Sequence, residues 1–202
     1  GVDARIRGLQ TVVDLDAVEP VERYTVLDRL ETARRRQVAL SHAVVGHLEH
    51  IQGCPPVYLV LADLLRVSRA EARRRLRDAE QLLPRVSLTG EPLPPQLPAT
   101  AAAWNAGVVD GEHLKVIQKF FRDLPGHVGP VEVAKAERSL AEHAATLRPD
   151  QLEKVAERLA LTINPDGTFS DEDRARQRGF VWCGGQRPDG MSTGKLIATP
   201  EL

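Results

Sequence analysis

Apolar residues recur at three- and four-residue steps along the first part of the chain, a pattern typical of an amphipathic helix. The apolar positions of this stretch are Val26, Leu30, Ala33, Leu40, Val44, Leu48 and Ile51. Gly53 and the pair Pro55-Pro56 end the pattern, so we expect one helix from about Pro20 to Ile51. A helix of about 30 residues is longer than the globular average. It must therefore either brace the whole domain or pair with a partner helix.

The next segment, at about 57–83, has the spacing of a helix-turn-helix. A first helix ends near Arg66, a tight turn passes through Val67, and Ser68 caps a second helix. The apolar positions of the second helix, spaced four, three and four, are Ala72, Leu76, Ala79 and Leu83. They predict its buried stripe. The segment departs from common helix-turn-helix usage at Arg66, where a glycine often eases the turn backbone.

Further helices and one hairpin are predicted beyond a proline-rich segment. Residues 84–98 hold five prolines and a glycine, which indicates a linker or surface loop. The remaining expected elements are helices at about 99–106, 110–124, 130–147 and 149–163, a turn at 164–167, a short charged helix at 171–178, and a β-hairpin from 180–183 and 195–197. The predicted fold class is mainly α: a multi-helix domain with a long N-terminal helix, a helix-turn-helix-like pair and a small β-hairpin near the C-terminus.

Three regions follow from these elements. We expect an N-terminal extension at 1–19, a helical domain over 20–163, and a C-terminal region at 164–202 that is the truncated start of a further region. The chain begins with Gly1 instead of methionine. Thr199-Pro200-Glu201 has the residues of a helix start. We therefore expect this chain to be part of a longer protein.

Composition narrows the class of protein. The 202 residues are 42% hydrophobic but only 4% aromatic, so the core must consist mostly of Leu, Val and Ala. The net charge of −1 gives no global field toward DNA or a membrane. Cys54 and Cys183 have no CxxC neighbour, which favours reduced thiols over a zinc cluster or a disulfide. With no transmembrane or signal-peptide pattern, we expect a cytoplasmic protein without membrane contact.

Positive charge gathers locally at the helix-turn-helix. Residues 61–90 hold seven arginines against four acids, a local balance of +3. Pairing at four-residue spacing would join Glu71 to Arg75 and Arg74 to Asp78. The other arginines of the second helix have no partner in these pairs and remain available to bind another molecule.

Arg69, Arg73 and Arg77 form a ladder at four-residue spacing, and Arg66 stands at the turn before them. Together they would neutralise about three or four phosphates. Ser68 would cap the helix and bond a phosphate. The predicted nucleic-acid-binding residues are Arg66, Ser68, Arg69, Arg73, Arg74 and Arg77. The alternative is a surface helix whose arginines stay in water and cover apolar neighbours with their stems.

Other clusters carry weaker signals. The run Arg34-Arg35-Arg36 favours a solvated helix face, with phosphate contacts as the alternative. His42, His47 and His50 share one helix, but no further ligand stands at metal-binding spacing. No Ser-His-Asp, Cys-His or nucleotide-loop signature can be assembled. We therefore predict no catalytic residue, no metal ligand and no cofactor in this chain.

Several short motifs in a specific order resemble the mycobacterial 13E12 repeat family. They are 61–68, 71–76, 107–117, the turn at 164–167, 173–176 and 189–191. The resemblance implies an actinobacterial domain of unknown function, number 222, followed by a C-terminal HNH endonuclease module. Such a nuclease needs His and Asn residues around a divalent metal to activate water. The chain holds no such cluster after Met191, so nuclease activity and its metal are expected only for the absent module.

Two hypotheses for function remain. The first is a DNA-binding or targeting module of an HNH-endonuclease-type protein, non-catalytic in this chain. The second is a helical dimerisation or protein-interaction domain without direct nucleic-acid contact, in which the long first helix pairs with a second copy. An enzyme in its own right is the least favoured class.

Overall fold

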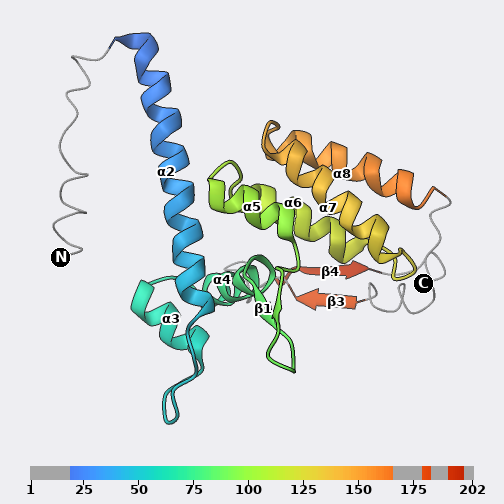
Figure 1. Ribbon diagram of the computed structural model, residues 1–202. Helices are drawn as coiled ribbons and strands as arrows, with labels where there is room; N and C mark the ends of the chain where they lie inside the picture. Colours follow the sequence, from blue (N-terminus) through green and yellow to red (C-terminus); the bar gives the residue numbers. More distant parts are fainter. Residues whose placement is uncertain (1–18, 166–178, 183–190, 198–202) are drawn as a thin grey trace. The chain divides into compact units, whose positions relative to one another are not determined.

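The computed structural model describes residues 19–165, 179–182 and 191–197 (Figure 1). Its helices are α2 (Pro20–Gly46), α3 (Val57–Leu65), α4 (Arg69–Leu82), α5 (Pro98–Ala106), α6 (Gly111–Asp123), α7 (Pro130–Ala144) and α8 (Pro149–Ile163). Two antiparallel hairpins pair β1 (Arg85–Val86) with β2 (Pro92–Leu93) and β3 (Gly179–Trp182) with β4 (Gly194–Ile197). The mainly α class is confirmed, and so is the small hairpin near the C-terminus.

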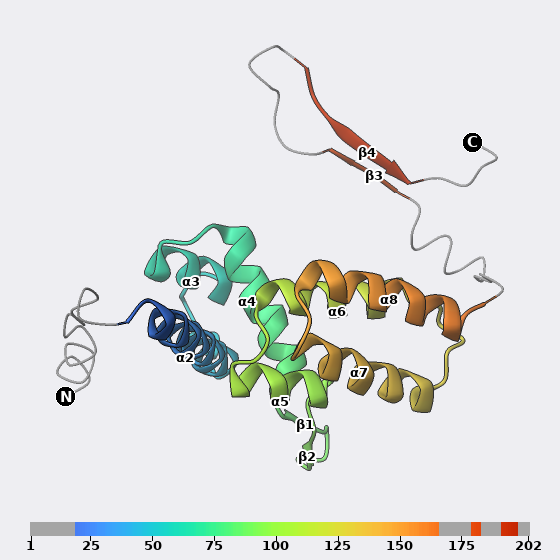
Figure 2. The same ribbon diagram turned by 90° about the horizontal axis from the view of Figure 1, so that it is seen from above.

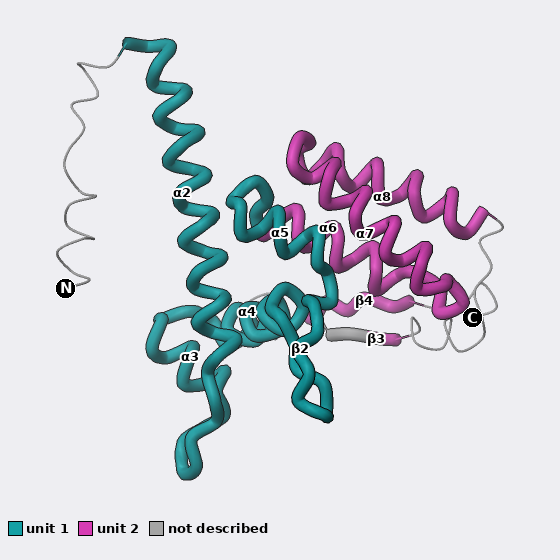
Figure 3. The backbone as a smooth tube through the Cα atoms, viewed as in Figure 1, with its two compact units in different colours: residues 1–110 teal, residues 111–202 magenta. Residues whose placement is uncertain are grey.

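The chain divides into two compact units, residues 1–110 and 111–202 (Figure 3). The first contains α2 to α5 with the β1–β2 hairpin, and the second contains α6 to α8 with the β3–β4 hairpin. A division at Asp110 was not predicted from the sequence. The charged helix predicted at 171–178 lies outside the described residues.

In the first unit, α2 packs against α4 and α5, and α3 packs against α4 (Figures 1 and 2). One core cluster joins the last turns of α2 to the helix-turn-helix. Its buried members are Val45, Leu61, Ala62 and Ala72, with Tyr58, Val67 and Leu76 packed against them. The helix-turn-helix is therefore fixed to α2 by apolar burial.

The long helix ends earlier than predicted and buries a different face. It stops at Gly46, and the backbone N–H of His47 bonds to the carbonyls of the preceding turn. Gly46 lies against the Leu83 side chain, which would have to move to admit a Cβ. The predicted apolar positions are not the ones by which α2 packs in this unit, because Leu30 and Leu40 are 62% and 66% exposed. The buried residues of α2 are Ala39, His42 and Val45.

The segment predicted as a linker or surface loop at 84–98 contains the β1–β2 hairpin. The Ser87 hydroxyl accepts a hydrogen bond from the backbone N–H of Glu91 at 2.9 Å, and Gly90 supplies a left-handed φ of 87°. The backbone N–H of Leu97 donates to the carbonyl of Gln81 at 3.2 Å, which ties the end of the segment back to α4. The loop prediction is therefore wrong for these strands, which are only two residues long.

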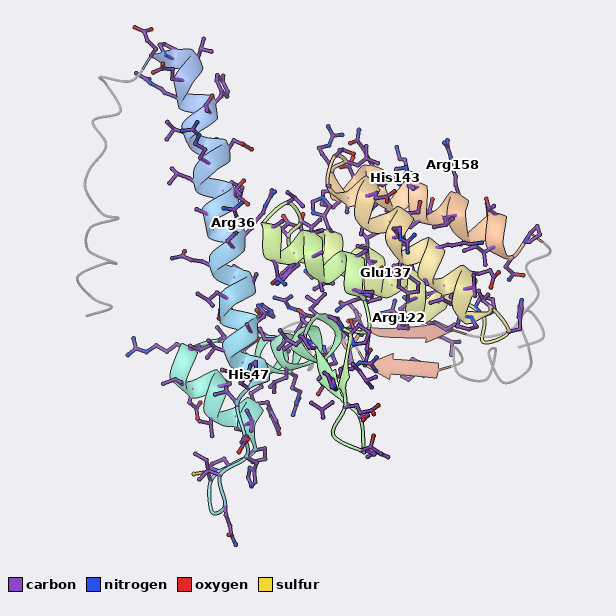
Figure 4. The ribbon with its side chains drawn as sticks, viewed as in Figure 1. Arg36, His47, Arg122, Glu137, His143 and Arg158 are labelled. Carbon is purple, nitrogen blue, oxygen red and sulfur yellow. The ribbon has the colours of Figure 1, made fainter. Side chains whose placement is uncertain are left out.

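The arginine run of α2 fixes the end of α5. The Arg36 Nε donates to the carbonyl of Ala106 at 3.0 Å, and Arg35 reaches the carbonyl of Val108 at 3.4 Å; Figure 4 labels Arg36 on α2. Gly107 ends α5 with φ 75°, and a Cβ there would lie 2.8 Å from the carbonyl oxygen of Thr32. These arginines are therefore more than a solvated face.

In the second unit, α6, α7 and α8 pack on one another. The fully buried side chains Leu114, Ile117, Leu140 and Leu152 form its centre. Proline occupies the first turn of both α7 and α8, where its missing N–H leaves no helical bond unmade. Among the described helices, none has the length and apolar character needed to cross a membrane.

Candidate nucleic-acid interface

The turn between α3 and α4 is tight because one residue takes a left-handed conformation. Arg66 caps α3 with φ 54° and ψ 43°, and Val67 donates its N–H to the carbonyl of Ala62 at 3.0 Å. In the described chain, Arg66 is the one non-glycine residue with positive φ. An L-residue in this conformation costs about 1 kcal/mol relative to glycine. Strain of this kind clusters at functional sites.

Ser68 begins α4 as predicted. Its Oγ accepts a hydrogen bond from the backbone N–H of Glu71 at 3.1 Å, which satisfies one free donor of the first turn. The hydroxyl is exposed and keeps its own proton, so it can still donate to an oxygen of a ligand. The cap and the positive end of the helix dipole therefore lie beside Arg66 and Arg69.

The arginine ladder lies on the exposed face of α4. Arg69, Arg73 and Arg77 are exposed, as is Arg66. The guanidinium carbon of Arg73 lies 4.1 Å from the centroid of the Tyr58 ring on α3. This stacking holds the guanidinium in place without neutralising its charge. In the described residues, no carboxylate pairs with any of these four arginines.

Arg74 has a different environment. Its Nη1 donates to Asp78 at 2.9 Å, while its Nε and Nη2 donate to Glu71 at 2.8 and 2.7 Å. Arg75 donates to Glu71 at 2.9 Å. The predicted pairs of Glu71 with Arg75 and of Arg74 with Asp78 are confirmed. Of the six predicted contact residues, five lie on an exposed surface, and Arg74 is tied down beside them.

The pairing of Glu71 predicts a pH dependence of stability. Hydrogen bonds from Arg74, and then from Arg75, lower the pKa of Glu71 from 4.5 to about 2. Because the folded pKa lies below the unfolded one, this contribution is complete above pH 4.5 and is lost as the pH falls toward 2. We expect it to be about 1 to 2 kcal/mol after solvent screening.

Urea unfolding at a series of pH values from 6 downward checks this expectation. Glu71→Gln should flatten the acid-side fall in stability. Glu80→Gln, an exposed change on the same helix, should leave the fall intact. Equal curves for the wild type and Glu71→Gln would remove Glu71 as the origin of the pH dependence.

A buried polar contact links α4 to α2 beneath the ladder. Asp78 is 1% exposed and His42 is 3% exposed. The His42 Nε2 lies 3.7 Å from the Asp78 carboxylate, and its Nδ1 lies 2.9 Å from the carbonyl of Val38. The His42 ring also meets Trp104 of α5 edge-on, with 5.3 Å between centroids. Sequence reasoning missed this contact, since it joins three helices through space.

The structure does not strengthen the histidines and cysteines as candidate metal ligands. The Nδ1 of His47, labelled in Figure 4, lies 2.7 Å from the carbonyl of Ala43. In the described part of the chain, no group of three His, Cys, Asp or Glu side chains could hold a metal ion. Cys54 is exposed, and Cys183 lies outside the described residues.

The second unit has an apolar groove of about 480 Å³ between α6 and α8, with Phe120 and Leu161 among its lining residues.

Comparisons with known proteins place the chain in a family. A family model described as "Domain of unknown function (DUF222)" matches residues 24–202. The uncharacterized protein MT1160 of Mycobacterium tuberculosis is 43% identical over 205 residues, covering 98% of this chain and 47% of that protein. The uncharacterized protein Mb1179c of Mycobacterium bovis is 44% identical over 208 residues, covering all of this chain and 45% of that protein.

These relatives are longer proteins, and this chain spans slightly less than half of their length. No solved structure matches the chain. The match covers most of the sequence, including the helix-turn-helix and both hairpins. The chain therefore belongs to the DUF222 family, whose domain is of unknown function.

Proposed function

We propose that this chain binds duplex DNA through its helix-turn-helix. The observation that carries the proposal is the row of exposed arginines on α4 and its turn, which have no carboxylate partner in the described chain. The contact surface consists of Arg66, Ser68, Arg69, Arg73 and Arg77. A line of guanidinium groups on an exposed helix face suits the regular spacing of backbone phosphates.

Two further observations support this surface. Arg66 keeps a charged side chain in a left-handed conformation that glycine would adopt without strain. The Ser68 hydroxyl and the first-turn N–H groups lie at the same end of α4, where an anion is favoured by the helix dipole. Charge, hydrogen-bond donors and the helix dipole therefore all favour an anionic ligand at the N-terminal end of α4.

Arg74 supports the surface instead of contacting the ligand directly. Its three side-chain hydrogen bonds go to Glu71 and Asp78. Reaching a phosphate would break the hydrogen bond that Arg74 donates to the buried carboxylate of Asp78, which costs free energy. We assign to Arg74 the role of holding the Asp78 carboxylate, which lies against His42 of α2.

Within a longer protein, the chain would act as a targeting module. The relatives extend well beyond the part that this chain matches. The resemblance to the 13E12 repeat family supports a second half with HNH-endonuclease chemistry, including its divalent metal. In that arrangement the residues of this chain locate the DNA and take no part in the cleavage step.

A salt titration of duplex binding tests the proposal. Four phosphate contacts give a slope of about −3.6 for log K against log salt. Fluorescence anisotropy of a labelled duplex, measured from about 50 to about 200 mM salt, should show K falling by roughly two orders of magnitude. Binding that is absent at low salt, or that does not vary with salt, would contradict the proposal.

A further inference from the structure

An apolar stripe runs along α2 on a face that nothing in the described chain covers. It consists of the apolar residues Val26, Leu30, Ala33, Leu40 and Val44 and is interrupted by the polar Gln37, at successive steps of four, three, four, three and four residues. Leu30, Leu40 and Val44 are 62%, 66% and 59% exposed. Scattered exposed leucines are ordinary on protein surfaces. A regular stripe over five helical turns is not scattered.

The stripe lies opposite the face by which α2 packs within its own unit. Ala39, His42 and Val45 are the buried residues of α2. Because 100° separates successive residues of a helix, this set points away from the stripe. The helix therefore has two apolar faces, of which α4 and α5 cover one.

The spacing of the stripe suits another helix. Alternating steps of three and four residues are the seam of a coiled coil, in which each side chain fits between four of the facing helix. A shallow groove of about 620 Å³ lies along α2; it is lined by Ala33, Gln37 and Leu40 of the stripe and by Asp28, Arg29, Thr32 and Arg36 beside it. From Val26 to Val44 the seam is about 27 Å long.

The stripe is complementary to itself when two copies run in opposite directions. A two-fold axis beside Arg35 pairs Val26 with Val44, and Leu30 with Leu40, of the other copy. The same axis pairs Ala33 with Gln37 of the other copy, so the Gln37 amide lies next to the small Ala33 side chain. Each layer then contains residues of matching or complementary size.

The arginines that lie beside the seam, near this axis, have partners within their own chain. Arg34 beside the seam is paired with Glu31 through contacts of 2.9 and 2.6 Å, so its charge is compensated within its own chain. Arg36 is directed to the Ala106 carbonyl of α5.

We propose that two copies of this chain associate through the α2 stripe as an antiparallel pair. The seam is shorter than three heptads, so we expect a weak association that depends on the protein concentration. If the helix-turn-helix binds DNA as proposed above, the dimer presents two such modules related by a two-fold axis. The association itself does not depend on DNA binding.

Sedimentation equilibrium of the full chain without DNA, from about 5 to about 500 µM, tests the association. The wild type should pass from monomer to dimer, and Leu30→Glu/Leu40→Glu should stay monomeric at every concentration. Leu161→Glu is the matched control, because Leu161 is also 67% exposed but lies on α8. Circular dichroism should show the same helix content for all three chains, since the changed leucines are exposed.

A wild type that stays monomeric at the highest concentration overturns the proposal. So does a Leu30→Glu/Leu40→Glu chain that dimerises as well as the wild type. Failure of the salt titration with an intact dimer would remove DNA binding alone, so the two proposals fail separately.

Disulfide trapping tests the direction of the helices in a background with Cys54→Ser and Cys183→Ser. A mixture of Leu30→Cys and Leu40→Cys chains should form the mixed disulfide. Each chain alone should stay reduced, because like positions of an antiparallel pair lie about 15 Å apart. Efficient self-linking of either chain would overturn the antiparallel arrangement.

Discussion

Changing Arg69, Arg73 and Arg77 together to alanine is expected to remove most of the affinity for duplex DNA at low salt while the helix content stays the same. Each arginine lies on the exposed face of α4 and has no ion-pair partner in the described chain. Three lost phosphate contacts reduce the salt slope by about 2.7 units. That reduction should leave a slope near one unit, from Arg66 alone. Anisotropy titrations at several salt concentrations measure both quantities.

A charge-matched variant separates a specific surface from net charge. Arg122, Arg138 and Arg158 are exposed in the second unit, and Figure 4 labels the first and the last of them. Changing these three to alanine lowers the net charge by the same amount. The variant should keep the wild-type salt slope to within about half a unit. An equal loss in both triple variants would show that only the total charge matters, and would refute the assigned surface.

The helix-turn-helix was predictable because its signals are local. Ser68 as cap and the apolar spacing of α4 act within a few residues of one another. They fix the ends of α3 and α4 to within a residue or two of the structure. The pairs of Glu71 with Arg75 and of Arg74 with Asp78 followed from helical geometry alone. The same geometry placed the ladder on one face.

The buried face of α2 was not predictable from periodicity. The helix has two opposite apolar faces, and the larger residues occupy the exposed one. The packed face uses Ala39 and His42, which a count of large apolar residues passes over. Burial of His42 depends on Asp78 and Trp104, which are far away in sequence. The β1–β2 hairpin was missed because strands of two residues leave no alternating pattern.

The stacking of Arg73 on Tyr58 could not be predicted from the sequence either. The two residues belong to different helices, and their contact depends on the angle between α3 and α4. Sequence could place Arg73 on an exposed face, but it could not indicate which aromatic ring supports it. Contacts of this kind determine how rigidly a charged surface is held.

Changing Asp78 to alanine is expected to lower the free energy of unfolding of the first unit by about 3 kcal/mol. The carboxylate is buried, accepts a 2.9 Å hydrogen bond from Arg74 and lies 3.7 Å from His42. Its removal leaves a partly buried guanidinium with one partner fewer and creates a cavity between α2 and α4. Urea unfolding followed by Trp104 fluorescence, in a Trp182→Phe background, measures the loss in this unit.

Two further variants show whether charge or volume is responsible. Asp63→Ala removes an exposed carboxylate of α3 and should change stability by less than about 0.5 kcal/mol. Asp78→Asn keeps the shape and one acceptor for Arg74. It should therefore lower the free energy of unfolding by more than Asp63→Ala and by less than Asp78→Ala.

In a double-mutant cycle of Asp78→Ala with His42→Gln, the effects of the two changes on the free energy of unfolding should be non-additive, because the side chains are in contact. A loss for Asp78→Ala as small as that for Asp63→Ala would mean that apolar packing alone holds α4 on α2. In that case Arg74 would be released from its supporting role and become available to a phosphate.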